Sequence, residues 1–166
     1  MSSIQAVTPD GIASLVAKLA GLRWSWSLAE IDQTLARSGW RRATELQEHG
    51  AVLSVGNDSV SGYADLQVRD GVAVQLRFML TRGARAADGD DVRRDVFATV
   101  ARVATEAVGP PSARIPGAKP EVRWEVSSGV LQTVDNGTFV EVSLLARHWL
   151  DWLDEMADEE NEGDDW

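Results

Sequence analysis

An alternation of apolar and polar residues around Asp70-Gly71 restricts the fold more than any other feature of this sequence. Because successive side chains of a strand point to opposite faces of a sheet, this period predicts two half-buried strands. Asp-Gly is favoured where both central residues of a two-residue turn need positive φ, so the segment predicts an antiparallel hairpin. Every second residue is apolar, at Ala64, Leu66, Val68, Val72, Val74, Leu76, Phe78 and Leu80.

Further strands are predicted on both sides of this hairpin. Residues 51–55 form an apolar run that ends at a Gly-Asn-Asp-Ser turn sequence. Residues 122–126 alternate again, and Asn136-Gly137 indicates another hairpin before a strand at 140–144. Such short runs bounded by turn residues are typical of strands. The proline-rich stretch between residues 109 and 120 is predicted to be a loop.

Four segments have helical signals. Thr8-Pro9-Asp10 is typical of a helix start, and Gly21 of a helix end. Ser27 and Glu30 have the spacing of a capping box. A polar stretch at residues 88–91 leads into a third helix, which ends at Gly109-Pro110. The last helix begins near Leu145 and has an amphipathic pattern.

These elements predict an α+β fold with an antiparallel sheet of about five strands, in the order α-α-β-β-β-α-β-β-α. Tight hairpins imply antiparallel pairing, and no βαβ alternation is present. The 166 residues fit one domain. We predict a single α+β domain at 1–157 and an acidic tail without regular structure at 158–166.

Acidic residues are concentrated at the C-terminus, where no Lys or Arg follows Arg147. A segment rich in carboxylates attracts basic surfaces and repels nucleic acid and anionic membranes. We therefore predict a partner-binding segment that recognises a basic protein surface; the alternative is a segment that only keeps the protein in solution. Its residues are Asp151, Asp154, Glu155, Asp158, Glu159, Glu160, Glu162, Asp164, Asp165 and Trp166.

The sequence contains no recognisable catalytic, metal or cofactor site. There is no cysteine, which excludes disulfides and thiolate chemistry. His49 and His148 are the only histidines, and neither belongs to a metal-ligand or serine-triad pattern. No signal peptide or membrane-spanning stretch is evident, so we expect a cytoplasmic protein without nucleic-acid or membrane partners.

Seven tryptophans are many for a chain of this length. Trp124, Trp149 and Trp152 follow strand or helix periods, so we assign them to packing. Of Trp24 and Trp26, we expect one to be buried at a helix start and the other to be exposed. Arginines such as Arg77 and Arg93 either gather into a basic patch or lie dispersed in solvent.

The predicted order of elements over residues 27–157 resembles the Tir-chaperone-like fold of type III secretion chaperones and YbjN-type proteins. A second resemblance rests on Arg23-Trp24-Ser25-Trp26-Ser27, Ser38-Gly39-Trp40 and Gly137-Thr138-Phe139-Val140-Glu141-Val142 before a tryptophan-rich helix. These residues resemble small actinobacterial proteins of unknown function, which tend to be encoded beside secreted toxin and type VII secretion genes. Both resemblances imply binding to another protein, and the chaperones are often homodimers. Neither supplies catalytic residues.

The leading hypothesis is a non-enzymatic immunity protein that neutralises a cognate secreted toxin by blocking a basic surface. The alternative is a secretion chaperone that holds an effector segment against a sheet edge or an apolar groove. An enzyme with an unfamiliar site is the third hypothesis, and it requires a polar pocket with strongly shifted pKa values.

Overall fold

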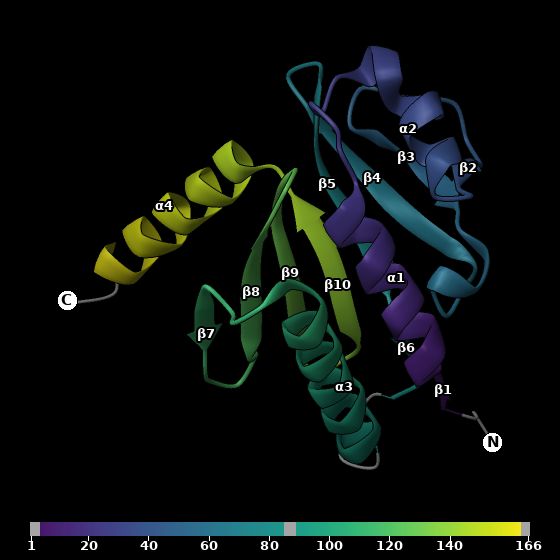
Figure 1. Cartoon of the computed structure of the whole chain (residues 1–166). Helices are drawn as coiled ribbons and strands as arrows, with labels where there is room; N and C mark the ends of the chain where they lie inside the picture. The colour runs from purple at the N-terminus through teal and green to yellow at the C-terminus, as the bar shows by residue number, and fades with distance from the viewer. Residues whose placement is uncertain (1–3, 85–88, 164–166) are drawn as a thin grey trace.

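The computed structural model describes residues 4–84 and 89–163, and side chains as far as residue 160. Four α-helices and ten strands lie within these ranges (Figure 1). In chain order they are β1 (Gln5–Ala6), α1 (Pro9–Gly21), α2 (Ile31–Arg37), β2 (Arg41–Arg42), β3 (Gly50–Ser54), β4 (Tyr63–Arg69), β5 (Val72–Met79), β6 (Thr81–Arg82), α3 (Asp90–Val108), β7 (Ala113–Ile115), β8 (Glu121–Val126), β9 (Gly129–Asp135), β10 (Val140–Leu145) and α4 (Arg147–Gly163).

Two antiparallel meanders join to form one large sheet. Its eight strands are antiparallel to their neighbours and follow the order β2-β3-β4-β5-β10-β9-β8-β7. The first meander ends at β5 and the second at β10, and these two strands pair at the centre. Strands β1 and β6 form a separate small sheet of two strands. The predicted α+β class is confirmed, whereas the predicted count of about five strands is wrong.

The hairpin at Asp70-Gly71 forms where its sequence predicts it. Both residues have positive φ, 53° and 76°, as a type I′ turn requires. Val72, which the alternation predicted to be buried, is 39% exposed, because the register shifts between Gln67 and Val68. Leu66 pairs with Leu76 across the hairpin, and Ala64 pairs with Phe78. All four side chains are buried on the face of the sheet that contacts the helices. We call this the front face.

Strands β9 and β7 are the main elements that the sequence analysis missed. In β9, the adjacent residues Val130 and Leu131 are both buried, so the alternation of apolar and polar residues is lost. Leu131 belongs to the front-face core, whereas Val130 packs with Leu145 and Leu150 on the opposite side. Strand β7 contains only three residues and lies in the proline-rich stretch that we predicted to be a loop.

Helices α1 and α3 lie against one another and cover the front face (Figure 1). The hydroxyl of Thr8 accepts a hydrogen bond from the Gly11 backbone N–H, which caps α1 as predicted. The capping box before α2 does not form. Ser27 makes no capping bond, and the residues after it form a 3-10 helix at Leu28–Glu30. The Glu30 carboxylate instead accepts a hydrogen bond from Ser25.

Trp24 and Trp26 are both buried, which corrects the prediction that one is exposed. Their rings pack together with centroids 4.8 Å apart. The Trp24 indole N–H donates to the Ser27 carbonyl, and that of Trp26 donates to the Ser128 carbonyl. The segment before α2 is therefore fixed against the turn between β8 and β9, about a hundred residues away in sequence.

Helix α4 leaves the sheet at the end of β10 and projects away from the molecule (Figure 1). It continues to Gly163, so residues 158–163 extend the helix beyond the predicted domain boundary at 157. Charged residues on all sides of the final turns are compatible with a helix exposed to water. Within the described ranges, no helix combines the length and the apolar character that crossing a membrane requires.

Candidate functional site

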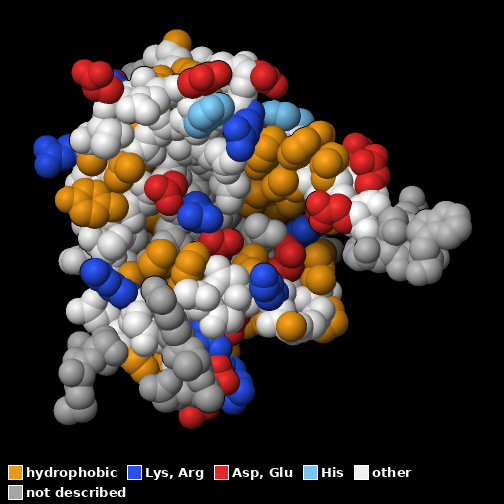
Figure 2. Space-filling model, turned by 180° about the vertical axis from the view of Figure 1, so that it is seen from behind, with side chains coloured by type: hydrophobic (Ala, Val, Ile, Leu, Met, Phe, Trp, Pro, Cys, Tyr) orange, Lys and Arg blue, Asp and Glu red, His pale blue; other side chains and the backbone are white. Residues whose placement is uncertain are grey.

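The back face of the sheet, opposite α1 and α3, carries polar side chains and is largely open. In β4 and β5, outward residues such as Asp65, Gln67, Gln75 and Arg77 alternate with the buried core residues. Figure 2 shows this side of the molecule, with a hollow at its centre and a hydrophobic patch beside it. The back face is therefore a concave surface that carries charged, polar and hydrophobic side chains.

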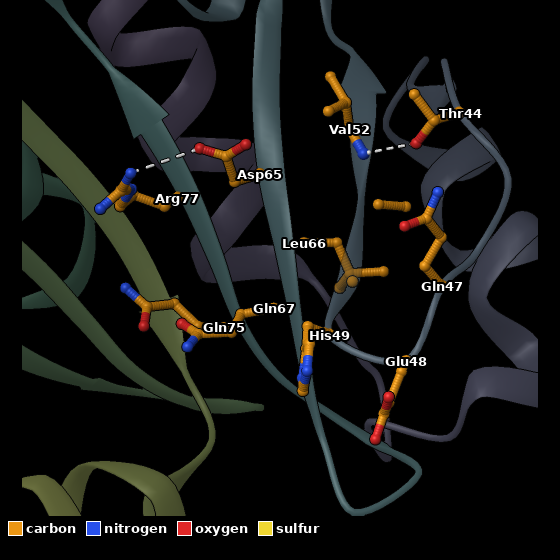
Figure 3. A pocket seen from close by; sticks show the side chains of 12 residues that line it. Thr44, Gln47, Glu48, His49, Val52, Asp65, Leu66, Gln67, Gln75 and Arg77 are labelled. Atoms are coloured by element: carbon orange, nitrogen blue, oxygen red, sulfur yellow. Dashed lines mark hydrogen bonds and ion pairs between the residues drawn. The ribbon is translucent and has the colours of Figure 1, made fainter.

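One hollow, which we call the sheet cavity, lies over β3, β4 and β5 and has a volume of about 690 Å³. Its floor comes from the three strands, and the loop before β3 forms one wall (Figure 3). Volumes of this size are typical of ligand-binding pockets. The lining residues are Thr44, Gln47, Glu48, His49, Gly50, Ala51, Val52, Asp65, Leu66, Gln67, Gln75 and Arg77.

A second hollow of about 700 Å³, the aromatic groove, lies between α4 and the turn of the β4–β5 hairpin. The rings of Trp149 and Trp152 stack there with centroids 4.9 Å apart. Trp152 has 47% of its surface exposed, so its assignment to packing is wrong. The lining residues are Gln67, Arg69, Asp70, Val72, Val74, His148, Trp149, Trp152 and Leu153.

The two hollows meet on β4, since Gln67 lines both of them. Arg69 lies next along the same side of the strand. Its guanidinium is 3.3 Å from His49 Nδ1, on the wall of the sheet cavity, and 5.7 Å from the centroid of the Trp149 ring. Both histidines are exposed. A continuous surface therefore runs along the hairpin from Asp65 to α4.

Arg77 and Glu141 form an ion pair on the back face. An Arg77 nitrogen lies 3.5 Å from Asp65 Oδ2, and another lies 3.7 Å from Glu141 Oε2. Glu141 Oε2 is shielded from solvent and accepts no hydrogen bond among the described residues. Burial raises the pKa of the Glu141 carboxyl above its ordinary value; Arg77 opposes this rise, and Glu121 adds to it.

Arg123 connects the back face to α4. It donates two hydrogen bonds, of 2.8 and 2.9 Å, to the Asp154 carboxylate, and a third of 2.8 Å to Glu121. These carboxylates, Asp154 first, raise the pKa of Arg123. A guanidinium held by two carboxylates orients both of them. Arg123 therefore fixes the direction in which α4 leaves the sheet.

The predicted partner-binding residues whose side chains are described fall into two groups, one paired with the sheet and one exposed on the helix. Asp154 forms the ion pair with Arg123, so it positions α4. The side chains of Asp151, Glu155, Asp158, Glu159 and Glu160 are exposed on the helix. Glu162 lies in the final turn, and its side chain is outside the described residues; Asp164, Asp165 and Trp166 lie outside them entirely.

The arginines are dispersed, which resolves the two alternatives left by the sequence. Arg77 and Arg123 lie on the back face, whereas Arg93 is buried in the first turn of α3 and contacts Asp90 and Asp135. Arg42 pairs with Asp32 at the edge of the sheet. Residues 85–88, which include Arg85, lie outside the described residues. Across the parts of the chain that the structure describes, no three His, Cys, Asp or Glu side chains are placed to hold a metal ion.

The sequence analysis missed the glutamines of the sheet cavity. Gln67 and Gln75 occupy outward positions of the predicted hairpin and were therefore treated as ordinary solvent-facing residues. The loop wall at residues 44–49 had no recognisable pattern. The one available signal was a pair of carboxamides at facing positions of two adjacent strands.

Comparison with known families gives one clear match. A model of DUF6301, a family of unknown function, matches residues 10–146. The chain belongs to this family. The match includes β2 to β10 and ends before α4, so the projecting helix of this DUF6301 protein lies outside the matched region.

Other comparisons add little about the DUF6301 protein. The search of curated proteins gave no match. Among solved structures, it is similar to the crystal structure of YjgB, a DUF4309 family protein from Bacillus subtilis, with 12% identity and a TM-score of 0.43. The similarity covers 84% of this chain and 98% of YjgB. Membership of a family of unknown function, as predicted, is thus confirmed, and the resemblance to secretion chaperones stays a prediction.

Proposed function

We propose that this protein is a cytoplasmic, non-enzymatic binding protein whose α4 and aromatic groove recognise a partner protein with a basic surface. The observation that carries this proposal is an exposed tryptophan, Trp152, which stacks on the half-buried Trp149 of an acidic helix. We propose further that the partner is a cognate secreted toxin and that binding neutralises it, which makes the protein an immunity protein.

The aromatic groove has the composition of a protein interface. Trp152 and Val72, which line the groove, have 47% and 39% of their surfaces exposed, and Met156, further along α4, has 40% exposed. Tryptophan is enriched among the residues that dominate binding energy, and an aromatic pair gives a rigid contact of large area. A neighbouring acidic rim adds specificity and accelerates association.

The charge of α4 selects the kind of partner. Asp151 lies 3.9 Å from Arg147, but no Lys or Arg follows Arg147 to balance the exposed carboxylates at Glu155, Asp158, Glu159 and Glu160. Two copies of this chain that met through α4 would bring equal charges together, so a homodimer through this surface is disfavoured. A basic surface meets the same helix with complementary charge. Toxin domains that act on nucleic acid have such surfaces, since they bind phosphate groups.

A secretion chaperone is the second candidate, and the open groove beside α4 favours it. A chaperone of the predicted Tir-chaperone-like type holds an unfolded effector segment. An immunity protein binds a folded toxin domain and abolishes its activity. The two functions are separated by whether the captured partner is active and folded before it is bound.

The test begins with capture of the partner from the native host at low salt, followed by kinetics with the purified partner. Reversing the charge of α4 with Asp158→Lys and Glu159→Lys is expected to lower the association rate by about 10-fold or more, since steering raises such rates by 10–10³. The matched control reverses two exposed carboxylates of α3, with Asp95→Lys and Glu106→Lys. Trp152→Ala is expected to increase the dissociation rate.

Equal association rates for the α4 variant, the α3 variant and the wild type would contradict the role of α4. Inhibition of the partner's catalytic activity by the wild-type protein, lost in the α4 variant, supports immunity. Capture of an inactive, unfolded segment supports the chaperone function instead.

A further inference from the structure

We infer that the sheet cavity binds an extended peptide segment of the partner, which lies along the β4–β5 hairpin and reaches the aromatic groove. The inference rests on the proposed function, because it names the part of the partner that this protein holds. It is carried by the carboxamide side chains that line the cavity and by the continuity of the cavity with the groove.

Three glutamines supply the recognition chemistry. Gln67 and Gln75 lie directly opposite one another on β4 and β5, and Gln47 lies across the cavity on the loop wall (Figure 3). Gln75 donates a hydrogen bond of 3.1 Å to Ser143. The side chains of Gln47 and Gln67 form no hydrogen bond within the described part of the chain. A carboxamide offers a donor and an acceptor together, as does a peptide group, so these two side chains match an extended main chain.

The charge balance of the cavity disfavours an anionic ligand, since Glu48 and Asp65 line it beside a single guanidinium. Its one guanidinium, Arg77, is already shared by Asp65 and Glu141. A phosphate or nucleotide would therefore meet a compensated cation beside carboxylates. The described residues that line the cavity include no Phe, Tyr or Trp ring on which a base or a sugar could stack, and the imidazole of His49 lies 3.3 Å from Arg69. Main-chain amides need neither a free cation nor a stacking platform.

The direction of the bound segment follows from the two hollows. The sheet cavity lies over residues 65–67 of β4, and the aromatic groove begins at Gln67 and continues past Arg69 to the hairpin turn. An extended chain advances about 3.3 Å per residue and alternates its side chains. A segment parallel to the hairpin can thus place its main chain near Gln67 while an apolar side chain contacts Trp152.

The experiment uses a phage-displayed library of random linear dodecapeptides, selected against the full-length wild-type protein. Enriched peptides are synthesised, and their affinities are measured by fluorescence polarisation. We expect Gln67→Ala to weaken binding about tenfold, equivalent to about 1.4 kcal/mol. Trp152→Ala is expected to weaken it as well. Gln33→Ala, at an exposed glutamine of α2, is the matched control and is expected to leave binding unchanged.

A second measurement tests whether the protein binds the main chain of the peptide. Methylation of successive backbone nitrogens of the best peptide is expected to reduce affinity at alternate positions, where an N–H faces a glutamine. Failure to enrich any linear peptide, equal binding by Gln67→Ala, or indifference to every N-methyl group would overturn the inference. The proposed function has its own test, because it fails if the captured partner associates equally fast with the α4 charge-reversal variant and with the wild type, whatever the peptides show.

Discussion

The two faces of the sheet are built from the same strands but differ in burial and in the chemistry of their side chains. On the front face, Trp124, Phe78 and Leu131 have no measurable exposure and pack against α1 and α3. On the back face, the side chains of Arg77 and Asp65 are 46% and 59% exposed. Since neighbouring residues of each strand point to opposite faces, stability and recognition are specified by alternate positions of one sequence. The back face can therefore change its chemistry without removing core contacts.

The largest expected effect is a difference in the free energy of unfolding between two tryptophan variants. Trp124→Ala removes a fully buried front-face side chain and is expected to lower the free energy of unfolding by about 3–5 kcal/mol. Trp152→Ala removes a half-exposed side chain and is expected to cost about 1 kcal/mol or less. Urea denaturation of both variants measures the difference. Similar losses would show that α4 belongs to the cooperative core, and the contrast between the faces would fail.

A smaller effect is expected where the back face holds α4. Arg123→Ala removes the hydrogen bonds to Asp154 and Glu121 and is expected to cost about 1 kcal/mol. Its more specific result is faster hydrogen exchange of the α4 amides, because the helix loses one of its links to β8 and, among the described residues, keeps only the ion pair of Arg147 with Glu125. Arg102→Ala, in an exposed i,i+4 pair with Glu106 on α3, is the control and is expected to cost about 0.5 kcal/mol or less. Unchanged exchange in α4 would refute the positioning role of Arg123.

The smallest effect concerns the shielded carboxyl of the back face. Burial raises the pKa of Glu141, so the folded protein binds this proton more tightly than the unfolded chain does. The resulting stabilisation is complete below the ordinary pKa and is lost as the pH rises through the folded-state pKa. Glu141→Gln is therefore expected to gain stability relative to the wild type between about pH 4 and pH 7.

Urea midpoints across this pH range, with Glu125→Gln as the control at an exposed glutamate, measure the gain. A wild type that is more stable than Glu141→Gln at neutral pH would show that the pair with Arg77 outweighs the cost of burial.

The sequence predicted those parts of the fold where a strand alternates or where a helix has clear start and stop residues. Alternation identified the β4–β5 hairpin, and the residues at the helix ends identified α1 and α3. The prediction failed at β9, where both faces are buried because α4 covers one corner of the back face. There, Val130 next to Leu131 leaves no alternation to recognise.

The candidate site was predicted only in part. The acidic residues of α4 were identified from composition. The helical periodicity did not show that only the first turns of the apolar side of α4 pack against the sheet. Leu150 is buried against the sheet, whereas Trp152 and Met156 remain exposed. The sheet cavity is lined by Gln67, Gln75 and a loop that are distant in sequence from α4. Its continuity with the groove is therefore evident only in the structure.

The order of the strands has a consequence for the synthesis of the chain. Strand β10 is the last strand to be translated, and yet it occupies the centre of the sheet between β5 and β9. The two meanders can join only after residues 140–145 have left the ribosome. Until then the nascent first meander has an unpaired edge at β5, and open edges invite pairing with other chains. The sheet is thus completed by the strand that comes last among its members in the sequence.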